Sequence, residues 1–249
     1  DQQIAYTFRP GSRWILPAQF WRQTVRYPGF SVEYYFVDTN VFTAKDPAAD
    51  EDHNICSSKH MDQDATCPIT GPDSVDACPG WFKDLWEKEQ AWLEESLGAS
   101  QADWQIIVTH FPPTWGMDFW EPLTHKHGVD LFVTGHMHLQ ALHHLEPSNA
   151  LRPSAWIVSG GGGGITSEYS PDPEGHDDAY GFFELTLSKK VIQIQGISHG
   201  GFLRTSTFLE PRPPASADAP GPGEEPFAAS DVAKAGGHGK GWFPFLHKQ

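Results

Sequence analysis

Basic residues are scarce in this chain, with 17 Lys and Arg against 32 Asp and Glu and a formal net charge of −15. A surface this acidic repels phosphate backbones, so we expect no nucleic-acid binding. A phosphate-bearing ligand would need a local positive focus, and bound metal ions are the obvious source. No apolar run reaches the length of a membrane span. Hydrophobic residues still make up 39% of the 249 residues, which predicts a globular fold.

Cysteine is also sparse, and Cys56, Cys67 and Cys78 all lie in one acidic stretch. No Cys-x-x-Cys pair occurs, so a structural zinc site is not expected. We predict one disulfide and one unpaired thiol, which implies a secreted protein or the lumen of a lysosome, vacuole or related compartment. Three reduced thiols in the cytosol are the alternative. The chain begins at Asp1 without a methionine or a signal-peptide pattern, so we expect a processed chain or a fragment.

The first part of the chain predicts a hairpin followed by a long insertion and a helix. Residues 3–20 indicate irregular chain, and residues 19–27 and 31–39 predict two strands around a Tyr-Pro-Gly turn. Residues 40–79 form an acidic, cysteine-containing insertion without a periodic pattern. The apolar spacing over residues 81–97 then predicts an amphipathic helix.

The second part alternates strands with a helix. Apolar runs at residues 104–109 and 129–134 predict two strands, with a short helix between them. Residues 156–159 predict a further strand, and residues 181–187 and 191–197 predict a closing hairpin. The order strand, helix, strand is typical of an α/β sheet.

Three histidines follow two of these strands. His110 comes directly after the first apolar run, and His136 and His138 follow the second one in a Gly-His-x-His motif. Ligands of open α/β sheets collect at the carboxyl ends of the strands, and imidazole suits zinc, iron and manganese. A lone histidine at a strand end is more often structural, and the chain has 13 histidines. The combination with a His-x-Pro motif about two dozen residues upstream favours a metal site.

Two motifs carry a resemblance to a known family. Thr-His-Phe-Pro at residues 109–112 and Gly-His-Met-His at residues 135–138 resemble the last two metal motifs of calcineurin-like metallophosphoesterases. Further segments between residues 3 and 208 resemble the small purple, tartrate-resistant type of acid phosphatase. The resemblance implies an α/β/β/α sandwich of two sheets, with residues 1–209 supplying the later half of the domain. Residues 210–249, rich in Pro, Ala and Gly, predict a flexible tail.

The resemblance also implies a reaction. His110 and His136 would bind one metal ion and His138 a second one, as a pair of iron with iron, zinc or manganese. These three histidines would form the catalytic centre, and a hydroxide held by the ions would attack phosphorus in line. The substrate would be a small phosphate ester or a phosphoprotein.

The chain departs from the family pattern in two respects. The Asp, bridging Asp, Tyr and Asn ligands of the family's earlier motifs have no counterpart here, so we expect the chain alone to be incomplete. A separate N-terminal fragment or a partner subunit could supply them. The substrate-facing histidine of the family is also missing, and Trp115, Asp118 or His125 could take its place. The alternatives are a phosphodiesterase of the same superfamily and a non-catalytic structural or interaction subunit.

The remaining candidates have simpler interpretations. The glycine run at residues 160–164 lacks the pattern of a dinucleotide-binding turn and predicts a loop packed close to the metal site. His143 and His144 predict a solvated loop, and His125 and His127 a helix surface.

Overall fold

The structure, a computed structural model, describes residues 2–59, 71–162 and 167–212. By its internal contacts the chain divides into Asp1–Arg212 and Pro213–Gln249, and the second unit lies outside the described residues. The predicted tail at residues 210–249 falls almost entirely there and stays a prediction. Within the part of the chain that the structure describes, none of the helices combines the length and apolar character that crossing a membrane requires.

The elements in chain order are α1 (Gln2–Thr7), β1 (Trp21–Tyr27), β2 (Phe30–Phe36), the 3-10 helix η1 (Asn40–Thr43), α2 (Cys78–Gly98), β3 (Trp104–Val108), α3 (Met117–His127), β4 (Leu131–Thr134), β5 (Gln140–His143), β6 (Ala155–Ser159), β7 (Gly181–Leu187), β8 (Ile192–Ser198) and β9 (Leu203–Leu209).

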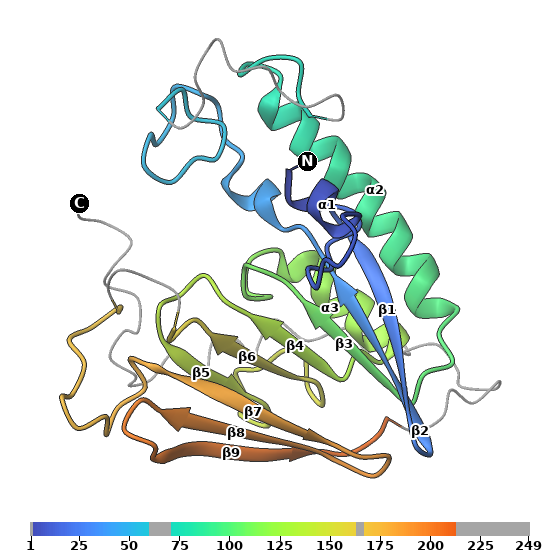
Figure 1. Cartoon of the computed structure of the whole chain (residues 1–249), viewed down its shortest axis with the longest axis vertical. Coiled ribbons are helices and arrows are strands. Elements are labelled where there is room, and N and C mark those ends of the chain that lie inside the picture. Colours follow the sequence, from blue (N-terminus) through green and yellow to red (C-terminus); the bar gives the residue numbers. More distant parts are fainter. Residues whose placement is uncertain (1, 60–70, 163–166, 213–249) are drawn as a thin grey trace, which may run out of the picture. The chain divides into compact units, whose positions relative to one another are not determined.

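A six-stranded sheet in the order β1-β2-β3-β4-β6-β5 forms the centre of the fold (Figure 1). The inner strands β2, β3, β4 and β6 are parallel, and the edge strands β1 and β5 are antiparallel to their neighbours. The hairpin β1–β2 turns at Pro28-Gly29, and Gly29 adopts the positive φ that favours glycine. The parallel strands bring their carboxyl ends to one edge of the sheet, and the motif histidines follow two of these strands.

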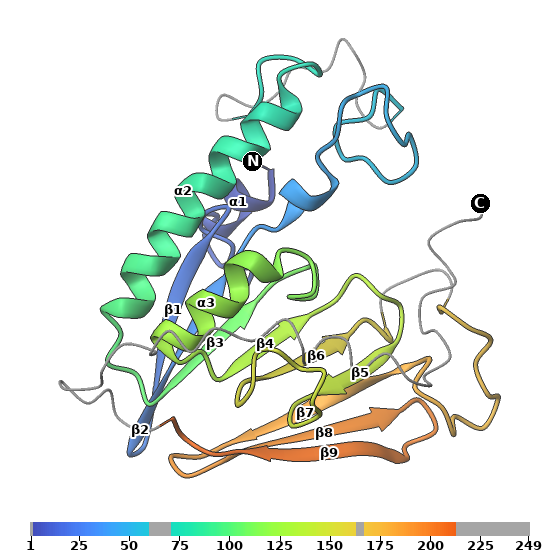
Figure 2. The same ribbon diagram turned by 180° about the vertical axis from the view of Figure 1, so that it is seen from behind.

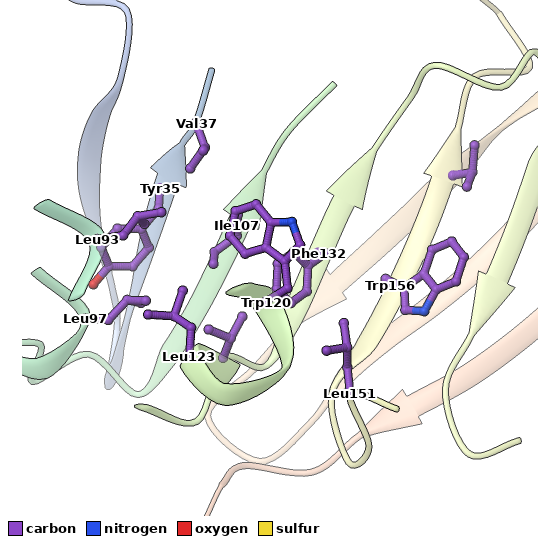
Figure 3. Packing of buried hydrophobic residues seen from close by; sticks show 12 residues of the cluster. Tyr35, Val37, Leu93, Leu97, Ile107, Trp120, Leu123, Phe132, Leu151 and Trp156 are labelled. Carbon is purple, nitrogen blue, oxygen red and sulfur yellow. The ribbon is translucent and has the colours of Figure 1, made fainter. Parts of the chain in front are cut away.

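Alternation along the inner strands creates two separate cores. Ile107, Phe132 and Trp156 point to the face that α2 and α3 cover, where they meet Leu93 and Trp120 (Figure 3). The residues next to them in sequence point to the other face, against the second sheet. A strand buried on both faces is a continuous apolar run, and β3 and β4 have that pattern because of this sandwich.

The second sheet has three antiparallel strands in the order β7-β8-β9 and lies against the first sheet (Figure 2). Ile192, Ile194 and Leu209 of this sheet pack on Ile106 and Leu131 of the first one. The layers are therefore helices, sheet and sheet, which agrees with the predicted two-sheet α/β sandwich. Among residues 2–59, 71–162 and 167–212, no helix lies on the outer face of the second sheet.

The acidic insertion is tied to a helix by a disulfide between Cys56 and Cys78, 22 residues apart. Cys78 is the first residue of α2, so the bond fixes the loop to the start of that helix. The predicted disulfide is therefore present in the structure. Cys67, the predicted unpaired thiol, lies outside the described residues.

One predicted assignment along the chain was wrong, because residues 3–20 begin with the short helix α1 and not with irregular chain. The strands β5 and β9 were not predicted. The predicted strands and both predicted helices are confirmed, with ends that differ by at most three residues.

Candidate metal centre

The histidine motifs meet at the carboxyl edge of the parallel sheet. His110 follows β3 and the segment Gly135 to His138 follows β4, and these two strands are adjacent. The two loops are joined by a backbone hydrogen bond, in which Gly135 N–H donates to His110 C=O at 3.0 Å. Parallel pairing therefore places the motifs side by side, as the spacing predicts.

His110 and His136 face each other with nitrogen atoms close together. His136 Nδ1 and His110 Nε2 are 3.3 Å apart. Two ligands held at about 2.0–2.1 Å by one tetrahedral zinc ion lie about 3.3 Å apart, so the two nitrogens fit ligands of a single ion. His136 also has a positive φ of 68°, which is unfavourable for a residue with a Cβ and is found at sites where geometry matters more than local stability.

Both imidazoles are biased toward the neutral form. Desolvation lowers the pKa of His110, and the charge of a protonated His138 lowers it further. Desolvation also lowers the pKa of His136, with a further contribution from His110. A neutral imidazole has a free nitrogen lone pair, so both rings are ready to bind a metal ion at neutral pH.

His138 belongs to the same cluster, but its backbone is engaged with an acidic residue. Its N–H donates to Glu168 Oε1 at 3.0 Å, and Ser167 Oγ donates to its carbonyl at the same distance. Within the described residues, no group of three or more His, Cys, Asp or Glu side chains is arranged to hold a metal ion. The structure therefore brings His110 and His136 into ligand geometry, and the three-histidine centre stays a prediction.

Two carboxyl groups, the half-buried Asp38 and the buried Glu89, lie near His110, and the sequence did not single them out. Asp38 follows β2, the strand beside β3, and its charge influences the pKa of His110. Glu89 of α2 is completely buried, and its Oε1 accepts the Asp38 N–H at 2.7 Å while its Oε2 has no partner among the described residues. Burial raises the pKa of Glu89 to about 9 and also raises the pKa of Asp38. An acidic residue directly after a strand next to His110 was the signal that could have identified Asp38.

The site lies within a region that matches a known family. Residues 23–140 match the calcineurin-like phosphoesterases, and all three predicted ligands lie inside this range. This part of the chain is therefore similar to the calcineurin-like phosphoesterases. No curated protein is similar enough to the chain to count as a match.

Two solved structures are among those similar to the chain. The chain is 17% identical to GAP50, the anchor in the inner membrane complex of Plasmodium, with a TM-score of 0.58 over 86% of this chain and 62% of that one. It is 13% identical to a purple acid phosphatase from yellow lupin seeds, with a TM-score of 0.45 over 80% of this chain and 36% of that one. The chain thus spans less than two thirds of either protein. At these identities the likeness to GAP50 concerns the fold alone.

The first glycine of the run packs directly against the histidine loop. A Cβ at Gly160 would lie 1.8 Å from Met137 O, so a side chain there would displace the loop that carries His136 and His138. A Cβ at Gly161 would lie 2.9 Å from Gly181 N, at the start of β7. This confirms the predicted close packing for residue 160, while residues 163–164 lie outside the described residues.

A cavity of about 590 Å³ is lined by His110. Asp38, Thr39 and Asn40 line it together with Gln3 and Gln19. Thr39 Oγ1 also accepts the Phe111 N–H at 3.2 Å, which ties the β2 loop to the His110 loop. His110 therefore shares this cavity with several polar side chains.

Of the three residues considered for the missing histidine, Trp115 lies at the site, with its ring centre 5.4 Å from that of His136. Asp118 and His125 are exposed residues of the first and last turns of α3. The solvated loop predicted for His143 and His144 is wrong for His143, which belongs to β5 and stacks on Trp156 with 3.7 Å between the ring centres. His144 follows the strand in a bend, and its Nδ1 lies 2.8 Å from Thr207 Oγ1.

Proposed function

We propose that the protein hydrolyses phosphomonoesters at a two-metal centre to which His110, His136 and His138 contribute ligands. The observation that carries the proposal is the 3.3 Å approach of the His110 and His136 ring nitrogens at the carboxyl edge of the sheet. Their position inside the calcineurin-like phosphoesterase region supports the reaction class. The finer assignment to phosphomonoesters rests on the resemblance to the acid phosphatases.

The chain's own residues have defined roles in this proposal. His110 and His136 would hold one ion between them, and His138 would contribute to the second, with iron and a partner iron, zinc or manganese as the expected pair. When bound, such ions neutralise phosphoryl charge and lower the pKa of water. Asp38 and Glu89 hold the turn beside His110 in place through the Asp38 N–H. The remaining ligands would come from a separate fragment or a partner subunit, in a secreted or lumenal setting.

A second candidate is a non-catalytic structural subunit. Two observations favour it: no group of three potential ligands is arranged for metal binding within the described residues, and GAP50, which shares the fold, is described as an anchor. In this case the two histidines would be remnants of a site, and the protein would act through its surface.

Metal content decides between these functions. The full chain is expressed and dialysed against zinc, manganese or iron, and its bound metal is measured by elemental analysis. We expect bound metal that is lost in the double variant His110→Ala, His136→Ala and kept in His125→Ala, a matched change of an exposed histidine on α3. Absence of metal from the unmodified chain, or equal metal in the double variant, would overturn the catalytic proposal in favour of the structural one.

Substrate assays then separate phosphomonoesterase from phosphodiesterase chemistry. The metal-loaded protein, together with any segment that co-purifies with it, is assayed on p-nitrophenyl phosphate and on bis-p-nitrophenyl phosphate. We expect hydrolysis of the monoester to exceed that of the diester. The reverse preference would support the phosphodiesterase alternative.

A further inference from the structure

Trp115 presents an exposed indole beside the candidate metal ligands. Its side chain is 37% exposed, and its ring plane is inclined by 82° to that of His136 at a centre-to-centre distance of 5.4 Å. A neighbouring tryptophan, Trp120, is almost completely buried at 1% exposure. The protein thus places one tryptophan in its core and a second at the rim of the site.

The indole of Trp115 packs against two phenylalanine rings. Its ring centre lies 5.0 Å from that of Phe111 and 6.4 Å from that of Phe42. The backbone of Trp115 is also fixed, because its carbonyl accepts a hydrogen bond from Trp120 Nε1 at 3.1 Å and its N–H donates to Pro112 O at 2.9 Å. An indole that is packed on one side and open to solvent on another is a preformed contact surface for a ligand.

The backbone after Trp115 supports the same arrangement. Gly116 has a φ of 88°, and a Cβ there would lie 2.6 Å from the Phe42 ring. Glycine at this position lets the chain turn into α3 while Phe42 remains packed under the indole. The aromatic wall formed by Phe42, Phe111 and Trp115 is therefore part of the local fold, and the outward side of Trp115 is left over for contact with a ligand.

The indole of Trp115 lies where the organic part of a bound phosphate ester would be. When the phosphoryl group is held at His110 and His136, the organic group on the ester oxygen has to lie next to these histidines. Trp115 and Met137, which is 40% exposed, are the large apolar side chains there that are exposed to solvent among the described residues. An indole face binds a planar aromatic ring better than a puckered aliphatic ring, because flat π-systems stack in close contact.

We propose that Trp115 is a specificity-determining residue that stacks on the organic group of the bound ester. The preferred ligand is a phosphomonoester whose ester oxygen lies on, or one carbon from, a planar aromatic ring. Aliphatic esters, such as those of glycerol or inositol, lack the flat surface and bind more weakly. This inference rests on the proposed function, because the phosphoryl group must be held at the histidines for the ring to reach Trp115.

Two matched phosphonates test the stacking without hydrolysis. Benzylphosphonate and cyclohexylmethylphosphonate carry the same number of carbon atoms and similar charge, but only the first has a flat ring. Their dissociation constants for the full chain with saturating zinc or manganese are measured by isothermal titration calorimetry, alongside inorganic phosphate. We expect benzylphosphonate to bind about tenfold more tightly than its saturated counterpart, the scale typical of aromatic stacking.

Variants assign the preference to Trp115. In Trp115→Leu we expect the two phosphonates to bind within about twofold of each other, while Trp115→Phe keeps part of the preference. Phe208→Leu, a change of an exposed aromatic residue on β9, should keep all of it. Thermal unfolding midpoints of all three variants show whether they are folded.

The outcomes separate this inference from the proposed function. If phosphate and both phosphonates bind but the unmodified chain does not discriminate between the phosphonates, or if Trp115→Leu keeps the discrimination, the stacking role is overturned and the phosphate site stands. If neither phosphate nor the phosphonates bind, the site itself is absent and both proposals are overturned.

Discussion

At the amino ends of the parallel strands, the buried Asp130 carboxylate meets a cation and a backbone amide, whereas at their carboxyl ends the buried Glu89 meets only an amide. Arg212 forms an ion pair with Asp130 and also donates to the carbonyls of Gly128 and Ala102. Gln105 N–H donates to the same carboxylate at 2.7 Å. Glu89 accepts the Asp38 N–H, and its second oxygen has no partner among the described residues.

This difference separates the structural end of the sheet, where the buried charge is paired, from the end where the motif histidines lie. Burial raises the pKa of Asp130 to about 6, and the nearby Arg212 opposes the rise, whereas the pKa of Glu89 is raised to about 9 with no cation to offset it. His136, whose backbone has a left-handed conformation, lies at the same end of the sheet as Glu89. Polar groups without hydrogen-bond partners and strained backbone conformations occur where a site is maintained at the expense of stability.

The largest expected effect is at the structural end. Arg212→Ala leaves Asp130 buried without its cation and should lower the free energy of unfolding by about 3 kcal/mol, measured by urea denaturation at pH 7. Arg204→Ala is the matched control, because its partner Asp178 is exposed and surface pairs contribute about 1 kcal/mol or less. Equal losses in the two variants would mean that the Asp130 pair is not structural.

An intermediate effect is expected at Glu89. Its pKa in the folded protein is raised from 4.5 to about 9, so the folded state holds a proton that the unfolded state releases above pH 4.5. The stabilising contribution of that proton is full below pH 4.5 and is lost as pH rises toward 9. Glu89→Gln keeps an acceptor for the Asp38 N–H and should raise the free energy of unfolding at pH 7 by up to about 3 kcal/mol.

The pH dependence of this gain is the diagnostic measurement. Urea denaturation at pH 5, 7 and 8.5 should show an advantage of Glu89→Gln over the unmodified chain that grows with pH. Glu95→Gln, a change of an exposed carboxylate on the same helix, should not show it. A constant difference across this range would mean that Glu89 is ionised in the folded protein.

The smallest expected effect concerns the backbone at His136. Glycine is normally less favourable than alanine, but at a φ of 68° the order reverses. His136→Gly should therefore be more stable than His136→Ala by about 1 kcal/mol, measured by thermal unfolding. Both variants should lose metal equally. A less stable glycine variant would indicate that the loop relaxes once the imidazole is removed.

Most of the fold could be predicted because its signals are local. The Tyr-Pro-Gly turn indicated the hairpin, and the apolar runs of β3, β4 and β6 were long enough to assign. Strand β9 was missed because its exposed side includes Phe208 and Leu203, which obscures the alternation of buried and exposed residues. Strand β5 was missed because it is short and contains His143, whose ring is covered by Trp156 from the neighbouring strand.

The site was predictable only where its residues share a motif. His110, His136 and His138 follow apolar strands, so their proximity follows from parallel pairing. Asp38, in the loop after β2, and Glu89, in α2, are 51 residues apart, and their hydrogen bond depends on how α2 packs on the sheet. The contact between Trp115 and His136 likewise depends on the turn at Gly116, because one glycine among 24 gives no indication of its φ angle.

The fit of Gly160 against Met137 has a consequence for motion near the histidines. The carbonyl of Met137 would lie only 1.8 Å from a Cβ at this position, and Gly160 N–H donates to Leu139 O at 3.1 Å. The end of β6 and the histidine loop therefore share a surface with no room for one to slide over the other. In hydrogen–deuterium exchange the amides of Gly160 and Met137 should open together as one cooperative unit, so any ligand that orders the loop would slow exchange on the neighbouring strand as well.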